Sequence, residues 1–505
     1  MNKTNRDIFI NIITSILGLI VSTLILLYVY RIANHTLGIE QIGLWSIVTT
    51  LTSLGNIGTF GITGSLVKFS AELKSKGEGE AIIGLLNSCI VLMAGLVIVF
   101  LAVLYIFSLL FLGSFVDIKF IDLAFALLPY SFFIFFLSTI GYLILSVIEG
   151  LNKSWQKNLV VIVSNILLLL FASIWIDQYG IYGIFYAQIV QAATLFFLAF
   201  ILIRINFGEY NVTVFNKNRE LLRRIANYGL KFQSISVLQL MGEPVTKFFL
   251  SRYGGLGLVG VFEMASRMVV QVRGIMVAII SNLLPKLVDI HSNHPSDKVN
   301  NVFKNVFMIN FEMFAFVYGM LILFSPIVVQ VWLGKSDMDL ISFIQWLSVA
   351  WFINSITVVP YIFNLGSGKL NGNVYSHALI GLSNVCIGIL IILLNLQPIT
   401  FIDGWMISLA VGSIFIIYEY TTRNEMRLSN IFSREQILIV LVIAGHFLLV
   451  SFLTIKGGLH PYLVYSCIGI SYLLLWSVYW LRSHSLVVIK GYFSSFNFLF
   501  TGKST

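Results

Sequence analysis

Seven charged residues lie within three consecutive apolar stretches, where acidic and basic side chains are rare. They are Lys231, Glu243, Lys247, Glu263, Arg267, Arg273 and Glu312. A charged side chain at the centre of a bilayer costs about 2.5–3.5 kcal/mol on insertion scales, so such residues face a water-filled cavity or one another. The cations can bind an anionic group such as a phosphate, and the acids can neutralise the cations.

The spacing of these residues separates paired charges from a free one. Glu243 and Lys247 are four residues apart, as are Glu263 and Arg267. Each pair therefore shares one face of a helix, and mutual neutralisation is expected. Arg273 has no acid three or four residues away in its stretch, so it is the best candidate for a cation in a cavity. The alternative is a side chain that extends to the membrane surface.

We therefore predict two groups of site residues. The candidate substrate-binding residues are Arg273, Arg267, Lys247 and Lys231, and their candidate charge partners are Glu243, Glu263 and Glu312. No metal site is expected, because His291 and His294 have no cysteine or third histidine nearby. No catalytic residue is expected either, because the sequence holds no nucleotide-binding motif and no nucleophile elbow.

The elements that position these residues are membrane helices. Apolar residues make up 58% of the 505 residues and charged residues only 10%, against about 25% charged residues in a soluble domain. We predict an all-α polytopic membrane protein with about 14 spans. They are 8–30, 43–67, 81–111, 121–147, 158–176, 181–203, 226–250, 256–284, 303–333, 340–365, 375–396, 401–420, 437–455 and 461–481.

The cations orient these spans. With a cytoplasmic N-terminus, 22 of the 31 lysines and arginines fall on the cytoplasmic side. The outer loops hold five: Arg31, Lys119, Arg252, Lys335 and Lys456. This bias follows the positive-inside rule and places both termini in the cytoplasm. The net charge of +9 is therefore mostly a topology signal, and no nucleic-acid partner is expected.

An internal repeat divides the chain. Gly38 and Gly43 recur as Gly255 and Gly260. The shift in sequence number is the same for both, and we call it the repeat offset. The turn at Gly150 recurs near Gly368. Six helices per repeat give two lobes of the same orientation, with a substrate cavity between them. We predict an N-lobe at 1–203, a cytoplasmic linker at 204–225, a C-lobe at 226–420, and two further helices with a cytoplasmic tail at 421–505.

These features resemble the multidrug/oligosaccharidyl-lipid/polysaccharide (MOP) flippase superfamily, and within it the Wzx-type flippases of O-antigen and capsule repeat units. The resemblance is carried by the stretches Leu37–Trp45, Gly55–Gly64, Lys68–Glu72 and Glu149–Lys153. It implies a carrier that moves undecaprenyl-pyrophosphate-linked oligosaccharides from the cytoplasmic to the periplasmic leaflet of the bacterial inner membrane by alternating access. It implies no cofactor, and it implies membrane lipids, a polysaccharide polymerase and a chain-length regulator as partners.

Two other functions stay open at this point. A cation-coupled multidrug exporter needs a buried carboxylate, yet no acid lies well inside the spans of residues 8–203. A membrane polymerase needs a sizeable periplasmic loop, and the predicted loops have about ten residues or fewer. For a flippase, the cations suggest a relay in which Arg273 captures the pyrophosphate, Arg267 holds it midway and Lys247 receives it near the outer face.

Overall fold

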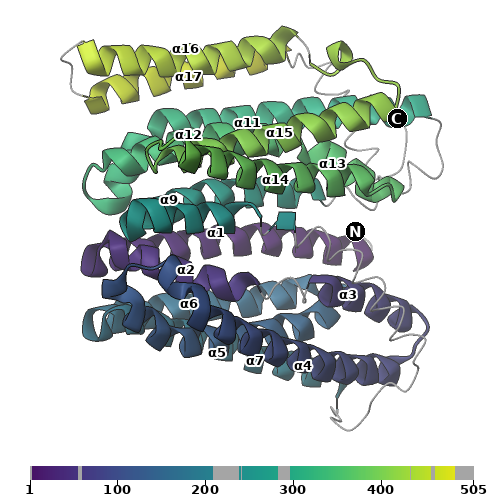
Figure 1. Ribbon diagram of the computed structural model, residues 1–505. Coiled ribbons are helices and arrows are strands. Elements are labelled where there is room, and N and C mark those ends of the chain that lie inside the picture. The colour runs from purple at the N-terminus through teal and green to yellow at the C-terminus, as the bar shows by residue number, and fades with distance from the viewer. Residues whose placement is uncertain are drawn as a thin grey trace. The chain divides into compact units, whose positions relative to one another are not determined.

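The computed structural model describes residues 3–54, 60–208, 238–239, 241–281, 296–432, 434–456 and 461–483 (Figure 1). Every regular element in these ranges is a helix, which confirms the all-α prediction for this part of the chain. The chain divides into two compact units. The first holds Met1–Glu263 and Ile387–Phe401, and the second holds Met264–Cys386 and Ile402–Thr505. The predicted lobe boundaries follow the repeat instead and stay a prediction.

Seven helices and the start of an eighth form most of the first unit. They are α1 (Lys3–Leu37), α2 (Ile39–Ser53), α3 (Phe60–Ser75), α4 (Gly79–Phe111), α5 (Ile118–Gly150), α6 (Ser154–Tyr179), α7 (Ile181–Phe207) and the first part of α9 (Glu243–Ser281). Helix α5 packs against α3, α4 and α7, while α6 packs against α1 and α7. The core of this unit is an apolar cluster that includes Leu86, Leu143, Ile148 and Ala199.

The second unit continues α9 and contains most of the later helices. They are α11 (Ser296–Leu333), α12 (Met338–Ile356), α13 (Val358–Ser367), α14 (Asn371–Leu393), α15 (Thr400–Arg423), α16 (Arg434–Lys456) and α17 (Pro461–Ser483). The last two helices pack against each other and against α11. Tyr472 of α17 donates a hydrogen bond to the carbonyl of Ala315 in α11 (3.2 Å), so these helices are docked onto the bundle.

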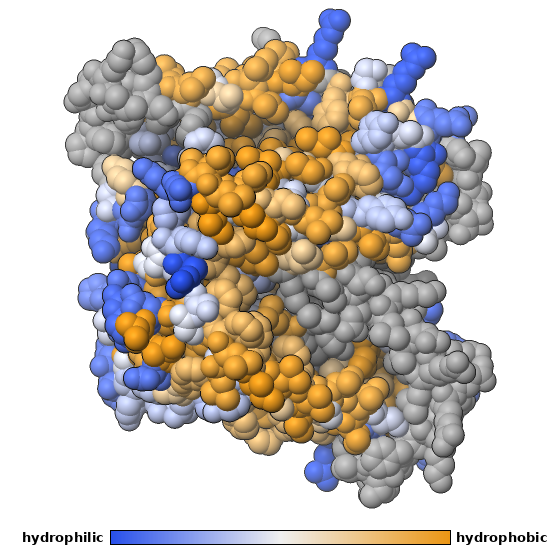
Figure 2. Space-filling view, in the orientation of Figure 1, coloured by the Kyte–Doolittle hydropathy of each residue, from blue (hydrophilic) through white to orange (hydrophobic). Residues whose placement is uncertain are grey.

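Ten stretches of the described residues are long and apolar enough to span a membrane. Apolar side chains cover the flanks of the helices, and polar residues gather at their ends (Figure 2). The chain is therefore a multi-pass membrane protein. Four predicted spans are not among the ten: 43–67 and 226–250 include undescribed residues, and α16 and α17 appear as helices with shorter apolar stretches, Gln436–His446 and Cys467–Tyr479.

The predicted repeat reappears in the helix boundaries and in one backbone conformation. Helices α4 and α11 begin at Gly79 and Ser296, separated by the repeat offset, and α6 and α14 begin with the same separation. Gly38, between α1 and α2, has φ 83° and ψ 169°. Gly255, its equivalent in the second repeat, has φ 79° and ψ 170° and interrupts α9. Only glycine adopts this conformation readily, so the two parts of α9 correspond to α1 and α2.

Candidate functional site

Three of the predicted charged residues form one buried cluster in the first unit. The Lys247 ammonium lies 2.9 Å from Glu243 Oε1 and 2.5 Å from Glu263 Oε2. Glu263 also accepts hydrogen bonds from the Tyr30 hydroxyl and the Ser46 hydroxyl, each at 2.7 Å. The side chains of Lys247 and Glu263 are only 4% and 2% exposed. The pair predicted from the spacing of Glu243 and Lys247 is therefore present, and helices α1 and α2 extend it into a network.

This cluster neutralises Lys247 in the structure. Two carboxylates hold one ammonium, and two hydroxyl groups donate further hydrogen bonds to Glu263. Removing one partner of a buried ion pair typically costs about 3–5 kcal/mol, because the other charge is left uncompensated. A role for Lys247 in binding an anion stays a prediction, and it requires this cluster to open first.

Arg273 lies in the second unit and has different surroundings. Its guanidinium carbon lies 5.3 Å from the centre of the Trp351 ring, a cation–π contact. The Trp351 and Trp405 ring centres are 6.4 Å apart. Within the described part of the chain, Arg273 Nε and both indole Nε1 atoms are buried without a hydrogen-bond partner. These groups can only donate, so the cluster suits a ligand that accepts hydrogen bonds, such as an oxyanion.

The remaining predicted residues lie elsewhere. The Arg267 side chain is exposed on α9. Glu312 of α11 is buried and accepts a hydrogen bond of 3.0 Å from the Tyr479 hydroxyl of α17. Lys231 falls outside the described residues. Among the described residues, no group of three or more histidine, cysteine or acidic side chains could hold a metal ion.

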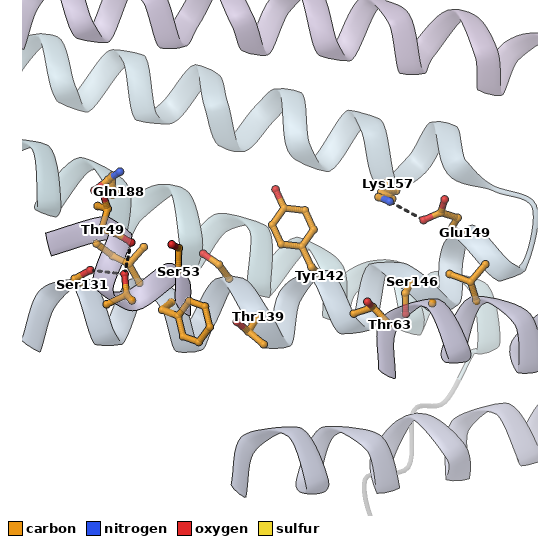
Figure 3. Close-up of a pocket in the computed structure, with 16 residues that line it drawn as sticks. Thr49, Ser53, Thr63, Ser131, Thr139, Tyr142, Ser146, Glu149, Lys157 and Gln188 are labelled. Atoms are coloured by element: carbon orange, nitrogen blue, oxygen red, sulfur yellow. Dashed lines mark hydrogen bonds and ion pairs between the residues drawn. The ribbon is translucent and has the colours of Figure 1, made fainter. Parts of the chain in front are cut away.

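A cavity with many hydroxyl side chains, which the sequence analysis did not predict, lies in the first unit (Figure 3). Its volume is about 760 Å³, within the usual range for a small-molecule site. Nine of its 16 lining residues carry a hydroxyl group. These nine are Thr49, Thr52, Ser53, Thr63, Ser131, Ser138, Thr139, Tyr142 and Ser146. Most of the lining surface is apolar, and the polar groups set into it are mainly neutral hydroxyls, which both donate and accept hydrogen bonds.

Helix α5 supplies the long wall of this cavity. Ser131, Ser138, Tyr142, Ser146 and Glu149 line it, and their spacing of three, four or seven residues places them on one face of the helix. At 1.5 Å per residue the stripe runs for about 27 Å, close to the thickness of the hydrocarbon core. In Figure 3 the Tyr142 ring lies between the Ser131 end and the Glu149 end.

The charges at this cavity are compensated. Glu149 and Lys157 form an ion pair of 2.6 Å at one end. At the other end, Thr52 and Ser131 share a hydrogen bond of 3.0 Å, and Gln188 accepts one of 3.3 Å from the Trp45 indole. The described lining thus offers no unpaired carboxylate to a cation. The sequence signal was weak, because hydroxyl side chains in membrane helices also bond to their own backbone, as Ser146 does to Leu143.

A second cavity, of about 360 Å³, lies in the second unit between α11, α12 and α16. Its lining is almost entirely apolar and includes Gly319, Ile322, Val349 and Leu448. Leu448 is 67% exposed, so this cavity opens to the surface of the unit beside α16. It suits a hydrocarbon chain rather than a sugar or a phosphate.

Comparison with solved structures defines the class of the fold. A lipid II flippase, MurJ, in an inward closed conformation aligns with a TM-score of 0.69 at 16% identity, over 93% of this chain and 98% of that chain. An inward-facing multidrug resistance MATE family transporter of the MOP superfamily aligns with a TM-score of 0.65 at 17% identity, over 80% of this chain and 94% of that one. A MOP superfamily transporter from Pyrococcus furiosus aligns at 0.58 and 16% identity, over 83% and 95%. The chain thus has the predicted fold of MOP-superfamily transporters.

The family follows from the sequence itself. Residues 6–291 match the polysaccharide biosynthesis protein family, more than half of the chain. The chain belongs to that family. No curated protein matches it in sequence. The predicted superfamily is confirmed, and a Wzx-type member agrees with the family match.

Proposed function

We propose that this protein is a flippase for lipid-linked oligosaccharides in the bacterial inner membrane, with both termini in the cytoplasm. It moves undecaprenyl-pyrophosphate-linked repeat units of O-antigen or capsule from the cytoplasmic to the periplasmic leaflet by alternating access. It catalyses no covalent step and uses no cofactor. Membrane lipids surround it, and a polymerase and a chain-length regulator are the proposed protein partners.

The hydroxyl-lined cavity along α5 is the observation that carries this proposal. Sugar hydroxyls both donate and accept hydrogen bonds, so they match the serine, threonine and tyrosine hydroxyls of the cavity. The Phe135 and Tyr142 rings add faces on which a pyranose can pack. Many weak neutral contacts also suit a carrier, which has to release its cargo as readily as it binds it.

The second unit, considered by itself, holds groups that suit the other chemical parts of the proposed cargo. A pyrophosphate offers only acceptors to hydrogen-bond donors, and the unpartnered Arg273 and indole N–H groups are donors. The apolar cavity between α11, α12 and α16 suits part of the polyprenyl chain. Arg267, Lys247 and Lys231 remain candidate contacts for the anion, with Glu243, Glu263 and Glu312 as charge partners.

A cation-coupled multidrug exporter has less support. The carboxylate of Glu149 in the cavity is paired with Lys157, so it is not available for an organic cation. The lipid II flippase structure leaves only 7% of this chain uncovered, about 35 residues. That is fewer than the two 23-residue helices α16 and α17 together. At least part of this trailing pair therefore has a counterpart in a protein named for a lipid-linked cargo.

Cells that lack the protein provide the test. They should accumulate complete lipid-linked repeat units on the cytoplasmic side and lose surface polysaccharide, and a plasmid copy should restore both. Accumulation of single repeat units on the periplasmic side would contradict a carrier and indicate a polymerase. Unchanged polysaccharide together with increased sensitivity to cationic drugs would indicate the exporter.

A further inference from the structure

The two repeats contact each other through two glycines, one in each repeat, and each glycine lies against the backbone of the other repeat. A Cβ atom on Gly43 of α2 would lie 1.9 Å from the backbone oxygen of Leu256 in α9. A Cβ atom on Gly260 of α9 would lie 2.2 Å from the backbone oxygen of Ile39 in α2. The repeat offset relates Gly43 to Gly260 and Ile39 to Leu256. The contact therefore has a local two-fold axis, and each helix packs a glycine against the backbone of the other.

The buried charge cluster obeys the same symmetry. Ser46 and Glu263 are related by the repeat offset and share a hydrogen bond of 2.7 Å. Tyr30 and Lys247, related in the same way, both contact Glu263. All four residues are eight positions from Gly38 or Gly255, which is about 12 Å along the helices. The cluster therefore lies on the local two-fold, one layer deeper than the glycine contact.

We propose that these two layers form a gate between the repeats, and that the structure holds it closed. The glycine contact excludes side chains at the first layer, and the network around Glu263 closes the second. With the N-terminus in the cytoplasm, the bends at Gly38 and Gly255 lie on the periplasmic side, so this is the periplasmic gate. This assignment of sides rests on the proposed topology and does not depend on the identity of the cargo.

The chemistry of the second layer explains how the gate can both hold and open. One repeat supplies hydroxyl groups, from Tyr30 and Ser46, and the other supplies the ions, Lys247 and Glu263. When the helices separate, the ion pairs of Lys247 with Glu243 and Glu263 stay within α9. The contacts that break include the hydrogen bonds that Tyr30 and Ser46 donate to Glu263, and a longer one of 3.5 Å from Lys247 to the Thr50 hydroxyl of α2. Lys247 therefore keeps both of its acidic partners when the gate opens.

Accessibility of a cysteine at position 46 tests the gate without measuring transport. Ser46 is 1% exposed, so Ser46→Cys should react slowly with a membrane-impermeant maleimide added from the periplasmic side of spheroplasts. The full-length chain is used, with Cys89, Cys386 and Cys467 replaced by alanine. Gly260→Ala should speed the labelling about tenfold or more, because the added methyl overlaps a backbone atom that cannot rotate away.

Gly257→Ala is the matched control, since a Cβ atom there meets nothing within 4 Å. Both changes replace a glycine by alanine in the same helix and raise its helix propensity equally. A difference in labelling between them therefore reports the contact of Gly260 with Ile39 and not helix propensity. Equal labelling of Ser46→Cys in the two backgrounds, or full labelling in the parent, would overturn the gate. A parent protein that shows this labelling pattern but does not carry lipid-linked oligosaccharide would contradict the proposed cargo and leave the gate standing.

Two further variants guard against misfolding. Glu263→Gln removes the charge without overlap, and it should also speed labelling while the protein stays abundant and folded in detergent. Gly43→Ala combined with Gly260→Ala should label no faster than the faster single variant, because both open one contact. Labelling rates that multiply in the double variant would show two independent contacts and overturn the symmetric gate.

Discussion

At the residue scale, two buried cations of the same chain have opposite surroundings. Lys247 is held between two carboxylates, whereas Arg273 has a tryptophan face and an unpartnered Nε. Spacing within a helix predicted the Glu243–Lys247 pair and the isolation of Arg273 from nearby acids. It could not predict that Tyr30 and Ser46 reach Glu263, because those residues come from other helices. Sequence distance reports neighbours only within one helix.

Arg273 is therefore the cation whose replacement should affect transport most directly. Arg273→Ala should abolish polysaccharide export, because it removes the one positive charge of the proposed anion site and leaves only the neutral indole donors. Arg273→Lys should restore export in part, since it keeps the charge without the planar, multidentate guanidinium. Export is measured in a deletion strain, with membrane abundance determined for each variant. An alanine variant that is normally abundant and exports at the wild-type level would show that Arg273 does not bind the anion.

At the element scale, α5 shows what apolar periodicity misses. Its span was predicted at 121–147, inside the observed Ile118–Gly150. The face that lines the cavity was not predicted, because serine, threonine and tyrosine interrupt an apolar run only weakly. Which hydroxyls face a cavity depends on how α2, α3 and α7 pack around α5. That packing depends on contacts between residues far apart in the sequence.

Tyr142 gives the sharpest test of this face. Tyr142→Phe keeps the ring that lines the cavity and removes only its hydroxyl, so transport should fall by about two- to tenfold, the effect of one hydrogen bond. The matched control is Tyr105→Phe, on the 45% exposed side chain of a tyrosine in α4. The measurement is the rate of repeat-unit export per unit of membrane protein. Equal rates for the two variants would remove Tyr142 from the sugar path.

At the scale of the whole molecule, the sequence predicted the order of helices and their repeat. The first reason is that lipid requires every span to be a long apolar helix. The second is that the same turn between two such helices needs the same glycine conformation in each repeat. Gly38 and Gly255 meet that requirement at equivalent places in the two repeats. The asymmetry between the repeats was also visible, since Arg267 and Arg273 have Thr50 and Asn56 at the equivalent positions.

The orientation of the chain is the last prediction, and the direction of transport depends on it. Cations collect on the cytoplasmic side because translocating them is costly, and 22 against five is a strong bias. Reporter fusions after Lys119, Lys335 and Lys456 should therefore be active in the periplasm, whereas fusions within 74–79 and 216–219 should be active only in the cytoplasm. Because 216–219 separates the two repeats, a periplasmic reporter there would mean an odd number of spans in the first repeat. The second repeat would then be inverted, and a gate built from equivalent residues at equal depth could not form.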